Sequence, residues 1–243
     1  MESHLFILEA AFFTVAAIYS MTGHGGASGY IAVMVLLGMA PSEIKPLALS
    51  LNLIVSASAS YQFYRAGHFR RELFLPFIVA SVPFAMLGGY LQLPTRWFNI
   101  LLGLALIFAA LHIAIRRSAD NLKQPSLPIA FLAGAGIGLM SGLIGIGGGI
   151  FLTPLLLLMG WANPKQAAAV SASFILCNSL YGLTGFIAHT GQTLPANFVW
   201  FALSVLLGGL IGARIGSHNL PMRTIAQVLS AVLLIGGAKL LYV

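Results

Sequence analysis

Charged residues are scarce in this chain of 243 residues: they make up 7% of it, and only five of them are acidic. A soluble domain carries about 25% charged residues, so the scarcity excludes a soluble fold. Four of the five acids lie near the ends of apolar segments, and only Glu9 lies a turn or more inside one. Cation pumps and carboxylate relays usually need acids within the membrane. The shortage therefore disfavours cation transport and is compatible with an anionic substrate.

Cysteine is also nearly absent. The single Cys177 excludes an internal disulfide and a metal site made only of cysteines. The six histidines are scattered and show no metal-ligand spacing, and no serine has a plausible base beside it. We therefore expect no enzyme, no cofactor and no metal site.

Apolar residues, by contrast, make up 59% of the chain, and the mean hydropathy is +0.96. Apolar runs longer than the roughly 20 residues needed to cross a bilayer continue along the whole chain and leave no room for a soluble domain. The start, Met1 to His4, is acidic where a signal peptide is basic, so we interpret it as leading into a first membrane segment. The basic residues sit at segment ends, which indicates membrane orientation rather than nucleic-acid binding. The sequence thus predicts an all-α integral membrane protein with lipid as its partner.

A glycine-rich interruption occurs twice between apolar segments, over residues 23–29 and 142–149. Clustered glycine costs about 1 kcal/mol per residue against alanine in a helix interior. Irregular backbone at membrane depth persists only where protein or a wet cavity satisfies its polar groups. Helices that open near Ser28 and Gly149 would aim free N–H groups and positive dipole ends into the interior. The two breaks therefore predict an anion site.

The two halves of the chain match each other at a spacing of about 120 residues. Gly25 and Gly29 align with Gly145 and Gly149. The only strongly polar linker separates the halves. We divide the chain into a first repeat, a cytoplasmic linker and a second repeat, over residues 1–117, 118–126 and 127–243.

Each repeat is predicted to hold two shorter segments around its break and then three longer helices. The expected segments span residues 5–22, 28–40, 44–65, 72–93 and 97–117, and residues 127–144, 149–160, 165–189, 197–217 and 222–242. Cytoplasmic loops carry an excess of Lys and Arg, which assigns the turn around Arg65, Arg70 and Arg71 to the cytoplasm. Counting crossings from this turn places equivalent joints of the halves on opposite sides. The repeats are therefore predicted to be inverted, each a broken helix or re-entrant hairpin followed by three transmembrane helices.

Three stretches carry a resemblance to a known family: residues 141–149 followed by Pro154, residues 48–52 running on to the 64–68 turn, and residues 178–182. There the chain resembles the sulfite exporter TauE/SafE family of permeases, and the resemblance spans essentially the whole chain. It implies a multi-pass protein of a bacterial-type inner membrane that moves small sulfur-containing anions such as sulfite, sulfoacetate and other organosulfonates. The first break departs from the pattern, because His24 and Ala27 interrupt its glycines.

Polar side chains recur inside two helices of this pattern. Asn52, Ser56 and Ser60 share one helical face, and Ser171, Asn178 and Gly182 do so in the matching helix. Close helix packing is the alternative for the serines. We predict a substrate site made of Gly25, Gly26, Ser28, Asn52, Ser56, Gly147, Gly148, Gly149, Ser171 and Asn178.

Proton coupling has two candidates, His24 inside the first break and Glu9 as the single carboxylate within a segment. Capping of exposed carbonyls is the alternative role of His24.

Inverted repeats with broken helices are typical of secondary transporters. We therefore expect a permease that exports a small sulfur-containing anion by alternating access. An anion channel, an uptake permease for another small anion and, less favoured, a membrane-embedded enzyme stay open as alternatives, as does the oligomeric state.

Overall fold

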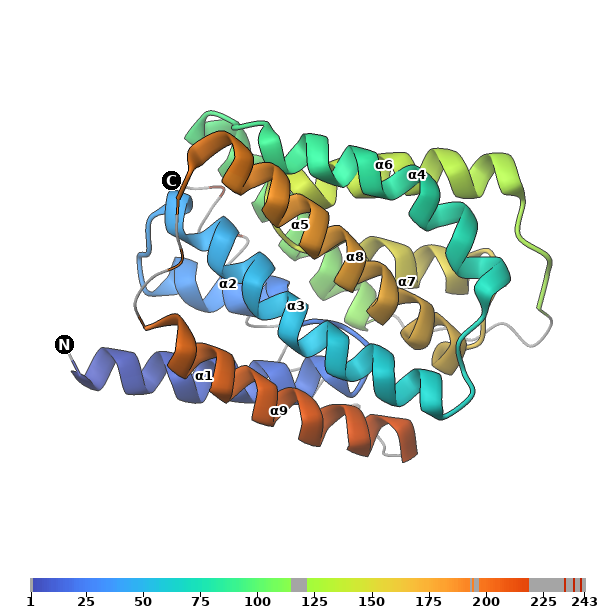
Figure 1. Cartoon of the computed structure of the whole chain (residues 1–243), viewed down its shortest axis with the longest axis horizontal. Coiled ribbons are helices and arrows are strands. Elements are labelled where there is room, and N and C mark those ends of the chain that lie inside the picture. The colour runs from blue at the N-terminus through green and yellow to red at the C-terminus, as the bar shows by residue number, and fades with distance from the viewer. Residues whose placement is uncertain are drawn as a thin grey trace.

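The computed structural model describes residues 2–114, 122–192, 194 and 197–218, together with positions 234, 238 and 241. These residues form helices joined by short loops, and no strand occurs among them (Figure 1). The helices are α1 (Glu2–Ser20), α2 (Ala27–Leu36), α3 (Pro41–Arg65), α4 (Arg71–Tyr90), α5 (Thr95–Ala114), α6 (Leu127–Ile144), α7 (Gly149–Leu158), α8 (Pro164–Thr190) and α9 (Phe198–His218).

The helix order confirms the all-helical fold and follows the predicted segments closely. Each half contains a helix, a glycine break, a ten-residue helix and then longer helices. Residues 127–144 match the prediction to the residue. The predicted last segment, 222–242, falls almost wholly outside the described residues, and so does part of the predicted linker.

Among the described residues, four helices are long and apolar enough to span a bilayer. They cover Arg71–Tyr90, Leu127–Ile144, Pro164–Thr190 and Phe198–Gly216. The short helices α2 and α7 are apolar but only ten residues long, about 15 Å at 1.5 Å per residue. They are therefore too short to span the hydrocarbon core alone.

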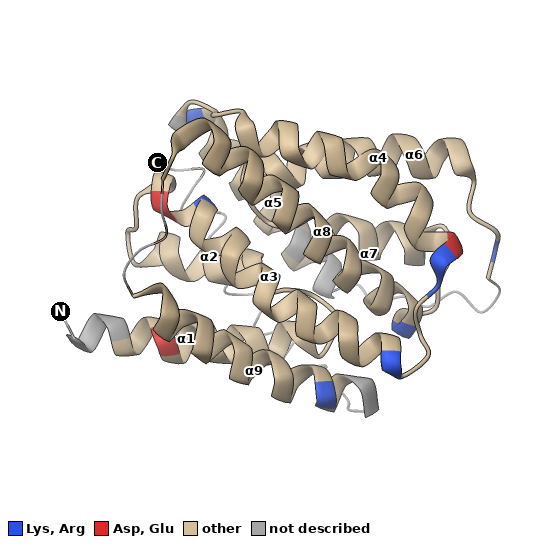
Figure 2. Cartoon of the chain, viewed as in Figure 1, with Lys and Arg blue, Asp and Glu red and all other residues tan. Residues whose placement is uncertain are grey.

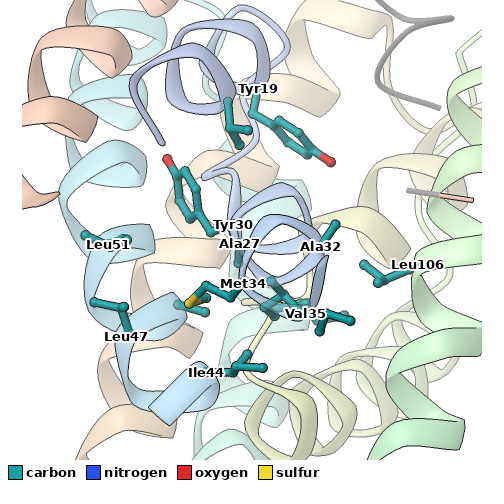
Figure 3. Packing of buried hydrophobic residues seen from close by; sticks show 14 of the residues in the cluster. Tyr19, Ala27, Tyr30, Ala32, Met34, Val35, Ile44, Leu47, Leu51 and Leu106 are labelled. Atoms are coloured by element: carbon teal, nitrogen blue, oxygen red, sulfur yellow. The ribbon is translucent and has the colours of Figure 1, made fainter. Parts of the chain in front are cut away.

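Both short helices are enclosed by protein. Eight of the ten residues of α2 are buried. Figure 3 shows its residues Met34 and Val35 packed among Ile44 and Leu47 of α3 and Leu106 of α5. Six residues of α7 are buried as well. This enclosure satisfies the requirement that interrupted backbone at membrane depth be covered by protein.

Helices of one half pack mainly on helices of the other. Figure 1 shows α1 alongside α9 and α4 alongside α6, and α3 and α8 also lie against each other. The pattern is reciprocal, because the first helix of each half packs on the fourth helix of the other half. The two halves are therefore interlocked rather than side by side.

Glycines allow the closest of these contacts. A side chain at Gly134, Gly138 or Gly142 of α6 would collide with a backbone carbonyl of α4. Gly208, Gly212 and Gly216 of α9 meet carbonyls of α1 in the same way. Small residues at intervals of four let membrane helices approach closely, so both seams are held by backbone contact.

Basic residues gather at one end of the helices. Arg65 ends α3, Arg71 begins α4 and Lys165 lies in the first turn of α8. Figure 2 shows Lys and Arg where α3 leads into α4. Burial and the nearby charge of Lys165 lower the pKa of His68, in the α3–α4 turn. The residues predicted to face the cytoplasm thus share one end, while the side of the membrane stays a prediction.

Candidate functional site

The two breaks share a pair of left-handed glycines, and the second break has one more at Gly147. Gly23 and Gly26 adopt left-handed φ angles of 73° and 94°, and Gly145 and Gly148 adopt 89° and 81°. Glycine takes this conformation without the cost that a Cβ imposes. The matching pairs are 122 residues apart, so the predicted pairing of Gly25 with Gly145 was wrong by two residues. The alignment of the two halves matched glycines by their positions in the sequence, whereas the structure matches the glycines that share a left-handed conformation.

At the first break the chain folds back on itself. The Phe12 and Tyr30 rings meet edge to face with centroids 5.3 Å apart, and the Ser28 hydroxyl donates to the Tyr19 hydroxyl over 3.0 Å. Helix α2 therefore runs antiparallel to α1. Behind the second break, Lys123 N donates to Gly160 O over 2.7 Å, which places the start of α6 and the end of α7 at one end of the molecule. Each break is thus the tip of a helical hairpin.

Asn52 of α3 joins the two tips. Its Oδ1 accepts a hydrogen bond from Ala27 N, the first residue of α2, over 3.2 Å. Its Nδ2 donates to Ile146 O in the second break over 3.4 Å and to Ser179 Oγ over 3.1 Å. The side chain is buried, at 1% exposure. One amide therefore satisfies backbone groups of both breaks, and this bridge makes them a single site.

Glycine is needed on both sides of this amide. A side chain on Gly25 or Gly147 would collide with the Asn52 amide. Ile175 of α8 closes the other side, with Cγ2 3.1 Å and 2.8 Å from where a Cβ on these two glycines would lie. Asn52 lies as far from Pro41 at the start of α3 as Ile175 lies from Pro164 at the start of α8. These two equivalent positions therefore lie on either side of the two glycines. The one in the first half is the polar Asn52, and the one in the second half is the apolar Ile175.

His24 lies in the first break and faces the second. Its Nδ1 is 3.1 Å from Thr22 O and 3.0 Å from Thr22 Oγ1. A carbonyl oxygen only accepts, so Nδ1 carries the hydrogen, and in the neutral ring Nε2 carries a lone pair. The Cδ2 edge beside Nε2 is 3.7 Å from where a Cβ on Gly149 would lie. The titrating nitrogen therefore belongs to the ring edge nearest the start of α7.

Comparison with known proteins identifies the family. The model of the sulfite exporter TauE/SafE family matches residues 8–240. The chain belongs to the sulfite exporter TauE/SafE family. It is 40% identical to a probable membrane transporter protein, y4hK, of Sinorhizobium fredii over all of both chains. It is 24% identical to the probable membrane transporter protein YunE of Bacillus subtilis over 92% of each. No solved structure matches the chain.

This TauE/SafE protein is therefore a multi-pass membrane transporter, as the resemblance predicted. The names of the relatives describe transporters, which agrees with the expectation that the chain is not an enzyme. No group of three potential metal ligands occurs among the described residues.

The TauE/SafE site brings together only part of the predicted set. Gly25, Gly26, Asn52 and residues 147–149 converge between the hairpin tips. Ser56 instead donates to the Asn52 carbonyl in its own helix over 2.6 Å. Glu9 lies in the first half of α1, away from the tips.

The matching stripe on α8 faces neighbouring helices. Ser171 accepts a hydrogen bond from Thr153 of α7 over 2.8 Å. Asn178 accepts one from Ser81 of α4 over 2.7 Å, and its Nδ2 has no partner among the described residues. Asn178 is not the counterpart of Asn52, since Ile175 occupies the position that matches Asn52.

Sequence reasoning missed Lys45, which was assigned to an outer joint. The side chain is only 5% exposed because α3 already begins at Pro41. Its Nζ donates to the carbonyls of Gly88, Gly89 and Leu91 at 3.1–3.3 Å. A cation is stabilising at a helix carboxyl end, and all three ammonium hydrogens are used there. Lys45 therefore holds the end of α4 and has no hydrogen left for an anion.

Proposed function

We propose that this transporter moves a small sulfur-containing anion, such as sulfite, sulfoacetate or another organosulfonate, through a site between the two hairpin tips. The observation that carries the proposal is the Asn52 bridge, because it unites the amino termini of two buried half-helices. The family description favours sulfite and export.

The chemistry of the tips suits an oxyanion. The amino terminus of a helix offers free N–H groups and a positive partial charge of about half a unit. An anion held there needs no arginine, and the tips contain none. Gly25 and Gly147 let both breaks approach the Asn52 amide, with which a side chain at either position would collide. The unpartnered Nδ2 of Asn178 is a further donor for substrate on the α8 side.

Alternating access is the mechanism that we propose for this architecture. We infer that the halves are inverted repeats, supported by their common order of helices and by the 122-residue spacing of their left-handed glycines. Inverted repeats move against each other around a fixed site near the bilayer midplane. The glycine seams between α1 and α9 and between α4 and α6 are the contacts along which such rocking would occur.

His24 is our first candidate for proton coupling. A neutral ring presents a lone pair at Nε2 and repels an anion, whereas the protonated ring donates from Nε2 and attracts it. Anion binding beside His24 and protonation of His24 therefore favour each other. Glu9 ranks second, because it lies away from the tips.

Flux into sealed proteoliposomes tests the proposal. Purified protein is assayed with sulfite, thiosulfate, sulfoacetate, taurine and sulfate, and we expect saturable transport of at least one sulfur oxyanion. Unlabelled substrate on the far side should accelerate exchange, as expected for alternating access, whereas a channel shows no such acceleration. Absence of flux for all five compounds would overturn the proposal.

A further inference from the structure

The amino termini of the two short helices differ in whether their first N–H group is already bonded. At α2, the N–H of Ala27 already donates to Asn52 Oδ1 over 3.2 Å. At α7, the first bonds run from Phe151 and Leu152 to Gly148 O, both over 3.1 Å. No described residue accepts from the N–H groups of Gly149 and Ile150 before them. The α7 end therefore retains donors aimed into the protein.

A buried hydroxyl without a partner lies beside this end. Ser141 of α6 is fully buried, and no described residue bonds to its Oγ. Its Cβ is 3.4 Å from where a Cβ on Gly148, the N-cap of α7, would lie. Burying a polar group without a hydrogen bond costs stability, so such a group calls for an explanation.

Several serines in this protein's helices avoid that cost locally. Ser20, Ser56 and Ser58 each donate to a carbonyl three or four residues earlier in the same helix. This bond is the usual one for a helical serine. Among the described residues, the Ser141 hydroxyl lacks a partner, as do those of Ser50 and Ser60 on α3. Ser141 differs from these two because it lies against the N-cap of α7, where its hydroxyl can bind a group that is not part of the chain.

Apolar side chains surround Gly148 and would strengthen a hydrogen bond to an anion at this position. Ile137 Cγ2 and Phe174 Cε1 lie 2.8 Å and 3.0 Å from where a Cβ on Gly148 would lie. Hydrogen bonds to an ionised group in apolar surroundings are stronger than those in water. The amino terminus of α7 therefore combines free N–H groups, the Ser141 hydroxyl and apolar neighbouring side chains.

We infer that the transported oxyanion binds at the amino terminus of α7, held by the N–H groups of Gly149 and Ile150 and by the Ser141 hydroxyl. The inference rests on the proposed function and assigns the anion to one of the two helix ends. The α7 end, whose first N–H is unbonded, holds the anion, while the first N–H of α2 is taken by Asn52. A ligand with at least two oxygens on one sulfur suits this arrangement, because one oxygen faces the helix end and another faces the hydroxyl.

Substitution of the hydroxyl tests the assignment. Dissociation constants are measured by isothermal titration with whichever anion of the five above the wild type transports. Ser141→Ala should weaken binding at least about tenfold, the loss expected for a hydrogen bond to a charged group. Its melting temperature without anion should be equal or higher, because an unpartnered hydroxyl has been removed. Ser141→Cys, which keeps the volume with a poor donor, should also bind weakly and serves if the alanine variant does not fold.

Two controls separate this site from its alternatives. Ser50→Ala removes another buried, unpartnered serine hydroxyl, on α3, and should leave binding unchanged. Tyr30→Phe removes the unpartnered hydroxyl that lies 2.7 Å from where a Cβ on Gly26 would lie, at the α2 end, and should also leave binding unchanged.

Three results would overturn the inference. Wild-type affinity in both Ser141 variants excludes the hydroxyl as a ligand, while wild-type transport preserves the proposed function. An equal or larger loss in Tyr30→Phe moves the anion to the α2 end or between both ends. A wild type that binds none of the anions removes the proposed function and this inference together.

Discussion

At the first break, the amino terminus of α2 meets the Asn52 amide, a histidine lies in the loop and α2 is buried almost throughout. At the second, the loop is nearly bare backbone and α7 opens beside an unpartnered serine. The two loops share left-handed glycines at Gly23 and Gly26 and at Gly145 and Gly148, and only the second adds Gly147. The comparison shows that two repeated breaks can share part of their backbone conformation while each contributes different functional groups. One break supplies the bridging contact and the titrating group, and the other supplies the open helix end.

The largest effect is expected from filling the second break. Gly148→Ala should abolish flux, because the added Cβ would crowd Ile137 and Phe174 at the helix end. Gly38→Ala is the matched control, since Gly38 also has a left-handed φ, 77°, but nothing lies within 4 Å of its Cβ position. Both changes carry a backbone cost of about 1–2 kcal/mol. Flux in proteoliposomes at equal insertion should be lost only in Gly148→Ala, and equal flux in the two would contradict the site.

The next largest effect is expected from replacing Asn52, the polar residue between the breaks, and is compared with a change at its apolar counterpart Ile175. Asn52→Leu removes three hydrogen bonds and should lower stability by about 3 kcal/mol, at ~1 kcal/mol each. Flux should fall about 100-fold or more, because the tips lose their common contact. Thermal melts and initial rates measure both quantities.

Ile175→Val is the control for this pair. It trims the apolar partner without adding or removing a polar group and should cost about 1 kcal/mol, with flux largely retained. If Ile175→Val were as inactive as the Asn52 variant, packing rather than the amide would unite the breaks.

The third effect is on pH dependence. His24→Asn keeps a side-chain donor near Thr22 but removes the titrating ring. Wild-type affinity should rise as the pH falls, because protonation of His24 places a cation beside the anion. The variant should lose this slope. Binding titrations at four pH values check it, and an unchanged slope would assign coupling elsewhere, with Glu9→Gln as the next variant.

The smallest effect on transport is expected at Lys45. Lys45→Met leaves the carbonyls of Gly88, Gly89 and Leu91 without the ammonium and should lower stability by about 2–3 kcal/mol. Affinity for the anion should stay within about twofold. A large loss of affinity at an unchanged melting temperature would instead make Lys45 a substrate ligand.

The sequence predicted the features that depend on local patterns. The bounds of α6, the two breaks and the polar character of Asn52 followed from hydropathy, glycine clustering and helical spacing. What Asn52 touches did not follow, because its partners Ala27, Ile146 and Ser179 come from three distant segments. Such contacts depend on how helices cross, which spacing along one helix does not fix.

Two further differences have similar causes. Lys45 was not among the predicted site residues, and lysine is rarely buried, but backbone carbonyls at the end of α4 replace its water. Ser141 was not among the predicted site residues. A helical serine usually donates a hydrogen bond to a carbonyl of its own helix. Only the three-dimensional arrangement reveals that its hydroxyl lacks a partner.

The first helix of each half packs on the fourth helix of the other half, and this arrangement has a consequence for biogenesis. Helix α1 leaves the ribosome long before α9, with which its glycine seam is formed almost two hundred residues later in the chain. During synthesis α1 must wait in the membrane or the translocon with that face uncovered. Truncation before α9 should therefore leave a fragment that inserts but whose α1 has no partner for this seam, and quality-control proteases should remove it.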